Sequence, residues 1–517
     1  MSFKRIFLAC VIVSGLVLAF MSIVQADPDR PVQAKAPTPY EAGVMRMAVV
    51  DHDSPFDILH GIEVGPRILV GEVFYPIEPG SGGETPINLS YYYDSVDAYA
   101  RLVAGWFGVP PAFADMVLSN FGTSLAEHLA TPREGIYADT PIAEGVFPLL
   151  LLFHGSAMRA HQTDDLPREY AERGYVVVAL DAPGVSPLTP VGRAMEPGFM
   201  ELGTALGSLP PCFDPLFASG ICFDPVNGEY GSPDGGGLVW MAPYLMEQYV
   251  IQRAYDGVAM IEEVKAVFPD HVDDTKVGVV GVSLGGPPTF MAPKLIDALR
   301  SMPDARYVGY GVVPSPMTLR SIGLDDGNGG LFGEAMGDII CQGDPSCDPF
   351  NAASSMNQPI GFGVAQEDGN IFNRENFLYS IPWWLGYGPD LSEEPSLSNK
   401  FPANRDVFES VVDGVPSIWV ELPDSQHLDE TTDPLFSLFD MFFMPDNRLV
   451  TGEPFTPLEI DTQIEIIAHY SLGFFDLTLK GKRGSLGALK TGRYNNVTED
   501  GRGVIVEAKS LEVPLHH

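Results

Sequence analysis

Short apolar runs alternate with helical patterns through the middle of the chain. Six runs of β-branched and aliphatic residues predict strands, at residues 149–153, 175–180, 276–280, 307–313, 360–364 and 417–422. Two earlier runs, 44–50 and 67–75, have the same character. Continuous apolar strands separated by helices are typical of a parallel sheet covered on both faces. The pattern therefore predicts an α/β fold with a mostly parallel central sheet.

Three segments predict helices that cover this sheet. Residues 164–173 are followed by Gly174, and a glycine commonly stops a helix. Residues 243–268 repeat apolar side chains at helical spacing. Residues 456–459 read T-P-L-E, a capping box with proline at the first helical position, and predict a last helix that ends at Gly481. Its inner face is predicted to consist of Ile464, Ile467, Ala468, Ser471 and Phe475.

The chain is predicted to form one catalytic domain over residues 44–482, after a Pro-rich linker at 27–43. Four insertions interrupt this domain, at about 76–146, 182–242, 314–358 and 369–416. Connections of this length are uncommon unless they form lids or binding loops, so we expect the last three to cover the active site. Residues 483–517 are polar and predict an irregular tail.

The N-terminus has the pattern of a secretory signal. Lys4 and Arg5 precede an apolar run at 6–24, and a small-x-small pattern ends at Ala26. Residues 1–26 are therefore predicted to be removed on export to the periplasm or the medium, leaving no membrane span in the mature chain. An uncleaved anchor is the alternative, because the run approaches the length that crosses a bilayer.

Charge excludes one class of partner. The formal net charge is −38, with 68 acidic residues against 30 basic ones. Such a surface repels nucleic acid and other polyanions. We therefore expect no nucleic-acid partner.

The cysteines indicate disulfides rather than a metal site. Cys10 lies in the signal segment, and the other four form two close pairs, Cys212 with Cys222 and Cys341 with Cys347. An even count in an exported chain indicates two disulfides. No metal-binding motif such as H-E-x-x-H is present, so we expect no metal and no cofactor.

A candidate nucleophile follows the strand predicted at 276–280. Residues 281–285 read G-V-S-L-G, the G-x-S-x-G pattern of a nucleophile elbow, between this strand and a helical pattern. The elbow assigns Ser283 as nucleophile and the backbone N–H of Leu284 as an oxyanion donor. A second donor is expected from the N–H of Ser156, just after the strand at 149–153.

The general base is expected after the nucleophile in the chain, because this kind of triad runs in the order Ser, acid, His. His469 lies in the predicted last helix, and His516 and His517 lie at the terminus. His427 is therefore the candidate base, in a polar loop after the strand at 417–422. His154 precedes the nucleophile and is expected to pack beneath its turn.

Asp368 is the first choice for the acid that orients the base, because it follows the strand at 360–364. Glu367 and Asp325 are the alternatives. Asp181 is expected to be a structural residue at a strand end.

These motifs resemble a branch of the α/β-hydrolase superfamily that contains platelet-activating-factor acetylhydrolases, dienelactone-hydrolase-like proteins and cutinase-like bacterial polyester hydrolases. The resemblance rests on the elbow and on residues 147–155, 172–181 and 474–481. It implies the α/β-hydrolase fold with long cap or lid insertions, and ester hydrolysis without a cofactor. It also implies the nucleophile on Ser283 and the base on His427.

We therefore expect a secreted serine hydrolase that cleaves small-molecule or polymeric carboxylic esters through an acyl-enzyme. A serine peptidase or an acyltransferase would use the same triad, and a hydrolase-like binding protein would keep the scaffold without the reaction. These alternatives stay open from the sequence.

Both cysteine pairs are predicted to be oxidised in the exported protein. Titration of free thiols in the denatured, unreduced mature chain should give about zero, since an oxidising compartment keeps such pairs bonded. Two or more free thiols per chain would contradict the disulfides.

Overall fold

The computed structural model describes residues 38–52, 67–83, 85–93, 95–99, 125–155, 158–183, 186, 189–191, 199–209, 211, 222–224, 229–231, 243–282, 285, 289, 306–312, 360–365, 413–414, 416–425, 458–490, 493–498 and 500–511. The predicted signal at 1–26, the predicted insertion at 314–358 and residues 369–412 of the predicted insertion at 369–416 lie outside these residues. No helix in the described part of the chain has both the length and the apolarity of a membrane span.

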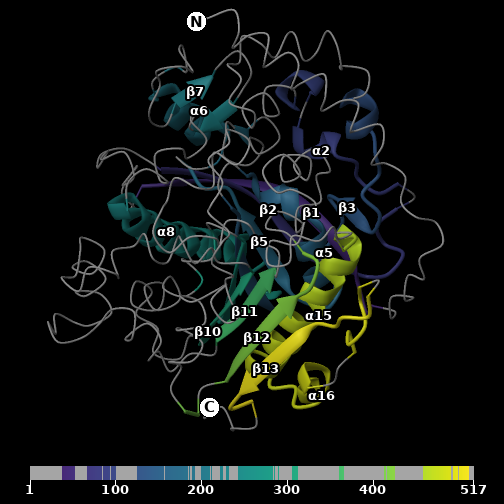
Figure 1. Ribbon diagram of the computed structural model, residues 1–517. Helices are drawn as coiled ribbons and strands as arrows, with labels where there is room; N and C mark the ends of the chain where they lie inside the picture. Colours follow the sequence, from purple (N-terminus) through teal and green to yellow (C-terminus); the bar gives the residue numbers. More distant parts are fainter. Residues whose placement is uncertain are drawn as a thin grey trace, which may run out of the picture.

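Ten strands form one sheet through the molecule (Figure 1). They are β1 (Glu41–Asp51), β2 (Arg67–Ile77), β3 (Ile136–Ala138), β4 (Phe147–Phe153), β5 (Val176–Leu180), β9 (Val272–Val282), β10 (Arg306–Val312), β11 (Ile360–Ala365), β12 (Ser417–Leu422) and β13 (Ile505–Lys509). Their order across the sheet is β13-β12-β11-β10-β9-β4-β5-β2-β1-β3. Every strand predicted from an apolar run is confirmed.

The sheet is mostly parallel. Neighbouring strands from β5 through β4, β9, β10 and β11 to β12 are parallel. β2 is antiparallel to both β1 and β5, and β13 is antiparallel to β12. All residues of β2, β4 and β5 are buried, as the strands of a sheet covered on both faces must be. The predicted α/β fold with a mostly parallel sheet is therefore confirmed.

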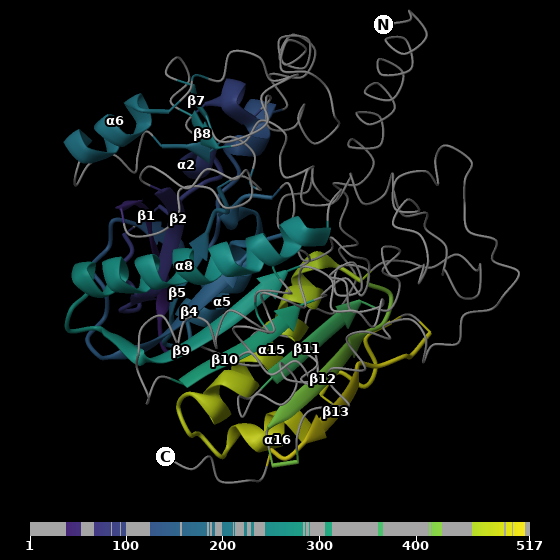
Figure 2. The ribbon, with the colours of Figure 1, turned by 90° about the vertical axis from the view of Figure 1, so that its left-hand side faces the viewer.

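Helices cover the two faces of the sheet. α5 (Asp165–Ala171) and α15 (Ile460–Thr478) pack together on one face, and α8 (Pro243–Val267) lies on the other (Figures 1 and 2). The predicted inner face of α15 is buried at every position: Ile464, Ile467, Ala468, Ser471 and Phe475.

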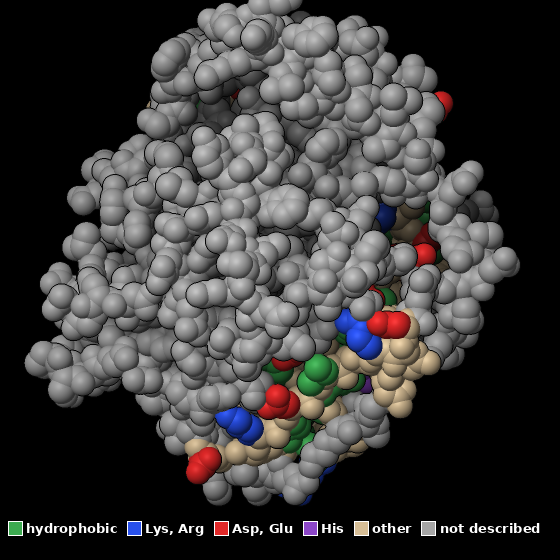
Figure 3. Space-filling model, viewed as in Figure 1, with side chains coloured by type: hydrophobic (Ala, Val, Ile, Leu, Met, Phe, Trp, Pro, Cys, Tyr) green, Lys and Arg blue, Asp and Glu red, His purple; other side chains and the backbone are tan. Residues whose placement is uncertain are grey.

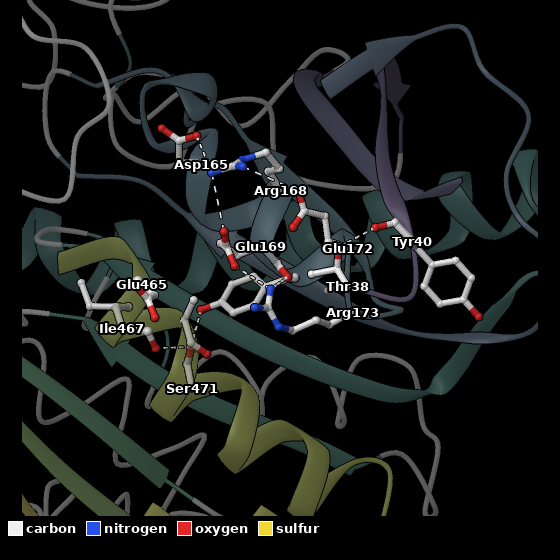
Figure 4. Close-up of polar contacts among 12 residues, drawn as sticks. Thr38, Tyr40, Asp165, Arg168, Glu169, Glu172, Arg173, Glu465, Ile467 and Ser471 are labelled. Carbon is white, nitrogen blue, oxygen red and sulfur yellow. Dashed lines mark hydrogen bonds and ion pairs between the residues drawn. The ribbon is translucent and has the colours of Figure 1, made fainter. Parts of the chain in front are cut away.

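A hydroxyl pair joins α5 to α15 inside this apolar layer (Figure 4). The Ser471 hydroxyl is fully buried and donates to the carbonyl of Ile467 at 2.6 Å. Because its proton is used there, the Tyr170 hydroxyl is the donor in the 2.8 Å bond between the two side chains. Both buried hydroxyls are thus satisfied, so the helix contact carries no desolvation penalty from them.

The last helix begins later than its predicted cap. α15 starts at Ile460 with Glu459 as N-cap and without a side-chain cap bond. The capping box predicted at 456–459 was wrong, because the backbone of Leu458 has other partners. Its N–H donates to the carbonyl of Asp424 at 2.8 Å, and its carbonyl accepts from the Gln463 side chain at 2.7 Å.

Two predicted boundaries also change, and one predicted insertion contains regular structure. The tail at 483–517 was predicted to be irregular, which was wrong: it forms α16 (Ser485–Lys490), and β13 adds a strand to the sheet. β1 begins inside the predicted linker 27–43. The insertion 182–242 contains α6 (Phe199–Gly207) and a small sheet of β6 (Thr189–Pro190), β8 (Glu229–Gly231) and β7 (Cys222–Asp224).

Candidate functional site

The strand order reverses at β4. After β4 the chain passes through α5 to β5 on one side of β4, and then through α8 to β9 on the other side. In open α/β sheets, ligands bind outside the carboxyl ends of the strands at such a reversal. The edge where β4 and β9 end is therefore the candidate site.

Two glycines allow the backbone segments after β4 and β9 to approach each other closely at this edge. Phe153 of β4 pairs with Gly281 of β9. A Cβ on Gly285 would overlap the carbonyl oxygen of Phe153 and lie 3.0 Å from that of His154. A Cβ on Gly281 would overlap the carbonyl oxygen of Gly285. Both glycines of G-x-S-x-G thus lie where a side chain does not fit, as a nucleophile elbow requires.

His154 lies beneath this edge and is fully buried. Its Nε2 accepts the N–H of Ala182 at 3.1 Å and lies 2.8 Å from the Ser186 hydroxyl. Nδ1 therefore carries the ring proton and donates to the carbonyl of Gly155 at 2.6 Å. Burial lowers the pKa of His154 to about 4, so the ring is neutral at neutral pH. Both nitrogens are engaged, and the predicted packing role is confirmed.

A buried arginine holds the ends of β4 and β5. Arg253 of α8 donates to the carbonyls of Leu180 and Asp181 at 2.8 and 2.9 Å. Its guanidinium lies 4.6 Å from the ring centroid of Phe153. Asp256 accepts from Arg253 at 3.1 Å and from an arginine of β2 at 3.0 Å. These charges are desolvated but paired, which is the arrangement that burial of charge requires.

Asp181 is a structural strand-end residue, as predicted. Its Oδ1 accepts the N–H of Ala160 at 2.7 Å, and its side chain is buried. This bond ties the segment after β4 to the end of β5.

A second buried cluster lies on β1 and β2. Arg46 donates to Glu72 at 3.0 Å, and His161 Nδ1 lies 3.8 Å from the same carboxylate oxygen. Burial raises the pKa of Glu72 to about 7 against the attraction of Arg46. Burial also lowers the pKa of His161, whose ring stacks on Tyr92 at 4.5 Å. Within the described ranges, no three His, Cys, Asp or Glu side chains lie close enough together to hold a metal ion.

The strands predicted to precede the acid and the base end at the same edge. Val282 of β9 pairs with Val312 of β10, and Val312 pairs with Gly363 of β11. Ala365 of β11 pairs with Leu422 of β12. The chain therefore leaves β11 and β12 on the side where it leaves β9.

The residues predicted to react lie outside the described residues: Ser283, Leu284, Ser156, Asp368, Glu367, Asp325 and His427. The same holds for Cys212, Cys341 and Cys347, whereas Cys222 is buried on β7. Both disulfides stay predictions. What the structure brings together is the framework around the predicted nucleophile turn: the end of β4, the end of β9 and the two glycines.

Sequence reasoning missed three residues of this framework. Arg253 and Asp256 lie three apart beside the apolar face of a predicted helix, and this charged pair was an available signal. Ser186 gave no signal, since a serine in a loop is common.

Comparison with known proteins leaves the family open. No known protein family matches the sequence, and no curated protein does. Among solved structures, the chain is similar to a ferulic acid esterase from Streptomyces cinnamoneus. The two are 15% identical with a TM-score of 0.43, and the match covers 88% of this chain and 93% of that one.

Replacing Gly285 with alanine should destabilise the protein, because the new Cβ meets backbone that cannot rotate away. We expect the free energy of unfolding to fall by about 1–3 kcal/mol, as overpacking does. Gly203→Ala in α6 is the matched control: beyond its chain neighbours and the backbone of its own helix, no atom lies within 4 Å of the new Cβ, and removing a helical glycine should raise stability by about 0.5–1 kcal/mol. Urea unfolding measures both, and equal stability of Gly285→Ala and wild type would contradict the close contact.

Proposed function

We propose that this chain is an exported serine ester hydrolase of the α/β-hydrolase fold. The observation that carries the proposal is the pair of glycines at 281 and 285, packed against the end of β4 where the strand order reverses. In this fold a serine between two such glycines is held on a sharp turn between strand and helix, with its hydroxyl exposed. The signal-like N-terminus supports export.

In the proposed reaction, Ser283 Oγ attacks the ester carbonyl carbon while His427 takes its proton, and Asp368 orients the imidazole. The alcohol leaves with the proton from His427, and water then hydrolyses the acyl-enzyme. The N–H groups of Leu284 and Ser156 would stabilise the oxyanion.

The contact of His154 with Gly155 supports the second oxyanion donor. In a trans peptide the N–H points away from the carbonyl oxygen of the same unit. The bond from His154 Nδ1 to the carbonyl of Gly155 therefore does not use the side of this peptide unit from which the proposed donor would act. The substrate class we propose is small-molecule or polymeric carboxylic esters.

A fluorophosphonate probe should label the exported protein covalently at Ser283, because an activated serine attacks the phosphorus. Ser283→Ala should remove the label and lower kcat for ester hydrolysis by about 10⁶, as loss of a triad serine does. Mass spectrometry of the peptides identifies the labelled residue. A folded wild-type chain that takes no label would favour the binding-protein alternative, and one that cleaves peptides instead of esters would favour the peptidase.

Asp368→Asn should lower kcat by about 10⁴, because the imidazole loses the group that selects its tautomer. The matched variant, Asp325→Asn, should change kcat little, since Asp325 follows β10 by a long insertion whereas Asp368 closely follows β11. Steady-state kinetics on both, with folding checked by circular dichroism, decide between the two acids. The reverse result would assign the acid to the loop after β10.

A further inference from the structure

The buried polar cluster on β1 and β2 contains a carboxyl group that uses only one of its oxygens. Glu72 of β2 is 1% exposed. Arg46 of β1 donates from Nε and Nη2 to Oε1 of Glu72, at 3.2 and 3.0 Å. Oε2 is buried and has no hydrogen-bond partner in the described part of the chain. Since a carboxylate only accepts hydrogen bonds, an ionised Oε2 has left water here without gaining a donor.

The ring of His161 lies beside this carboxyl group. Its Nδ1 is 3.8 Å from Oε1 of Glu72, which is too long for a hydrogen bond. Its Nε2 is buried and has no hydrogen-bond partner among the described residues. Aromatic contacts hold the ring instead, because it stacks on Tyr92 with centroids 4.5 Å apart and meets Tyr93 edge to face at 4.7 Å. The imidazole is thus fixed next to Glu72 by contacts that use neither ring nitrogen.

Groups that carry charge or titrate face Glu72 from the elements packed against it. They are Arg46 on β1, Tyr92 on α2 (Ser90–Tyr93), Arg159 and His161 at η2 (Ala160–Thr163), and Asp181 after β5. The ion pair of Arg133 with Asp164 lies near Tyr92 and His161. The arginines favour the ionised form of Glu72, whereas burial and Asp181 oppose it.

A proton that enters this cluster is better placed on Glu72 than on His161. A protonated His161 would add a buried cation next to Arg46 and Arg159, and burial together with these arginines lowers the pKa of the ring. A protonated Glu72 instead removes a buried charge whose Oε2 has no donor. The arrangement therefore favours a neutral carboxyl group beside a neutral imidazole.

We propose that Glu72 is a proton-operated switch of stability, which binds a proton inside the folded chain at mildly acidic pH and releases it at alkaline pH. Release leaves an ionised carboxyl group in the interior and weakens the fold. Burial raises the pKa of Glu72 from 4.5 to about 7, against the attraction of Arg46. The switch is independent of the proposed ester hydrolysis, because it acts on unfolding and uses no group assigned to that reaction.

The sign of the effect follows from the raised pKa. The folded chain binds this proton more tightly than the unfolded chain, so the contribution of Glu72 to stability is lost as the pH rises from about 4.5 through about 7. Burial lowers the pKa of His154 and His161, which has the opposite effect: stability falls as the pH drops below about 6.5. A variant that removes the titration of Glu72 alone separates the two contributions.

Glu72→Gln is this variant, because glutamine has the shape of a protonated carboxyl group and does not titrate. Its folding equilibrium constant, divided by that of wild type, should rise by about tenfold between about pH 6 and pH 8, where only wild type loses the proton. Urea unfolding of the full chain at both pH values, at one salt concentration, measures this ratio. A constant effect of the amide on stability cancels, since only the change of the ratio with pH is used.

Glu465→Gln is the matched control. Acidic and basic side chains lie side by side on the described part of one face of the molecule, where they are open to solvent (Figure 3). Glu465 also forms a partly exposed pair, with Arg493 at 3.0 Å and side chains 26% and 37% exposed. Solvent screens such a pair, so the corresponding ratio for Glu465→Gln should stay within about twofold between the two pH values.

A ratio for Glu72→Gln that is constant or falls as the pH rises overturns the proposal, because the Arg46 pair would then keep Glu72 ionised. An equal rise for Glu465→Gln overturns it as well. If Glu72→Gln does not fold, the double variant Arg46→Met with Glu72→Met replaces it, since apolar side chains often substitute for a buried ion pair. The same tenfold rise, to about that precision, is expected of the double variant, and its absence refutes the switch.

Discussion

The close approach of Gly285 to the carboxyl end of β4 is the contact on which the candidate site depends. The carbonyl oxygens of Phe153 and His154 occupy the space that a side chain at Gly285 would need. The turn after β9 is thereby pressed against the segment after β4, and the register of the two strands leaves little freedom in their relative position. The proposed nucleophile and one proposed oxyanion donor would belong to these two segments, so contacts of the backbone would hold them together. Catalysis by preorganised dipoles requires this kind of rigidity.

Next to this contact, buried polar and charged side chains bind the backbone groups where the strands end. Arg253 satisfies the last carbonyls of β5 and is itself neutralised by Asp256. His154 stays neutral because burial disfavours its charged form, so it accepts from Ala182 and donates to Gly155 at once. Each of these groups is costly to bury alone and acceptable once paired. Together they fix the ends of the strands without taking part in the proposed reaction.

The strands could be predicted because apolar residues dominate each core run, which a sheet buried on both faces demands. β13 was missed for the opposite reason. It is an edge strand with exposed or half-exposed side chains, so only its backbone pairing with β12 identifies it. The start of α15 was misplaced because local capping chemistry at 456–459 was outweighed by a long-range bond from Leu458 to Asp424. For the site, the motif predicted the turn and its two glycines, whereas the choice between Asp368, Glu367 and Asp325 depends on loop geometry that spacing does not encode.

Different contacts surround the proposed nucleophile and the chain that precedes the proposed base. The proposed nucleophile, Ser283, is flanked by two glycines that pack against described backbone, whereas the proposed base, His427, follows the end of β12. A hydrogen bond from the Leu458 N–H to the Asp424 carbonyl ties the chain just after β12 to the start of α15, and Arg502 pairs with the Asp424 carboxylate. The C-terminal segment therefore does more than add an edge strand to the sheet. By supplying Arg502, it ties the chain after β12 to the segment between α16 and β13.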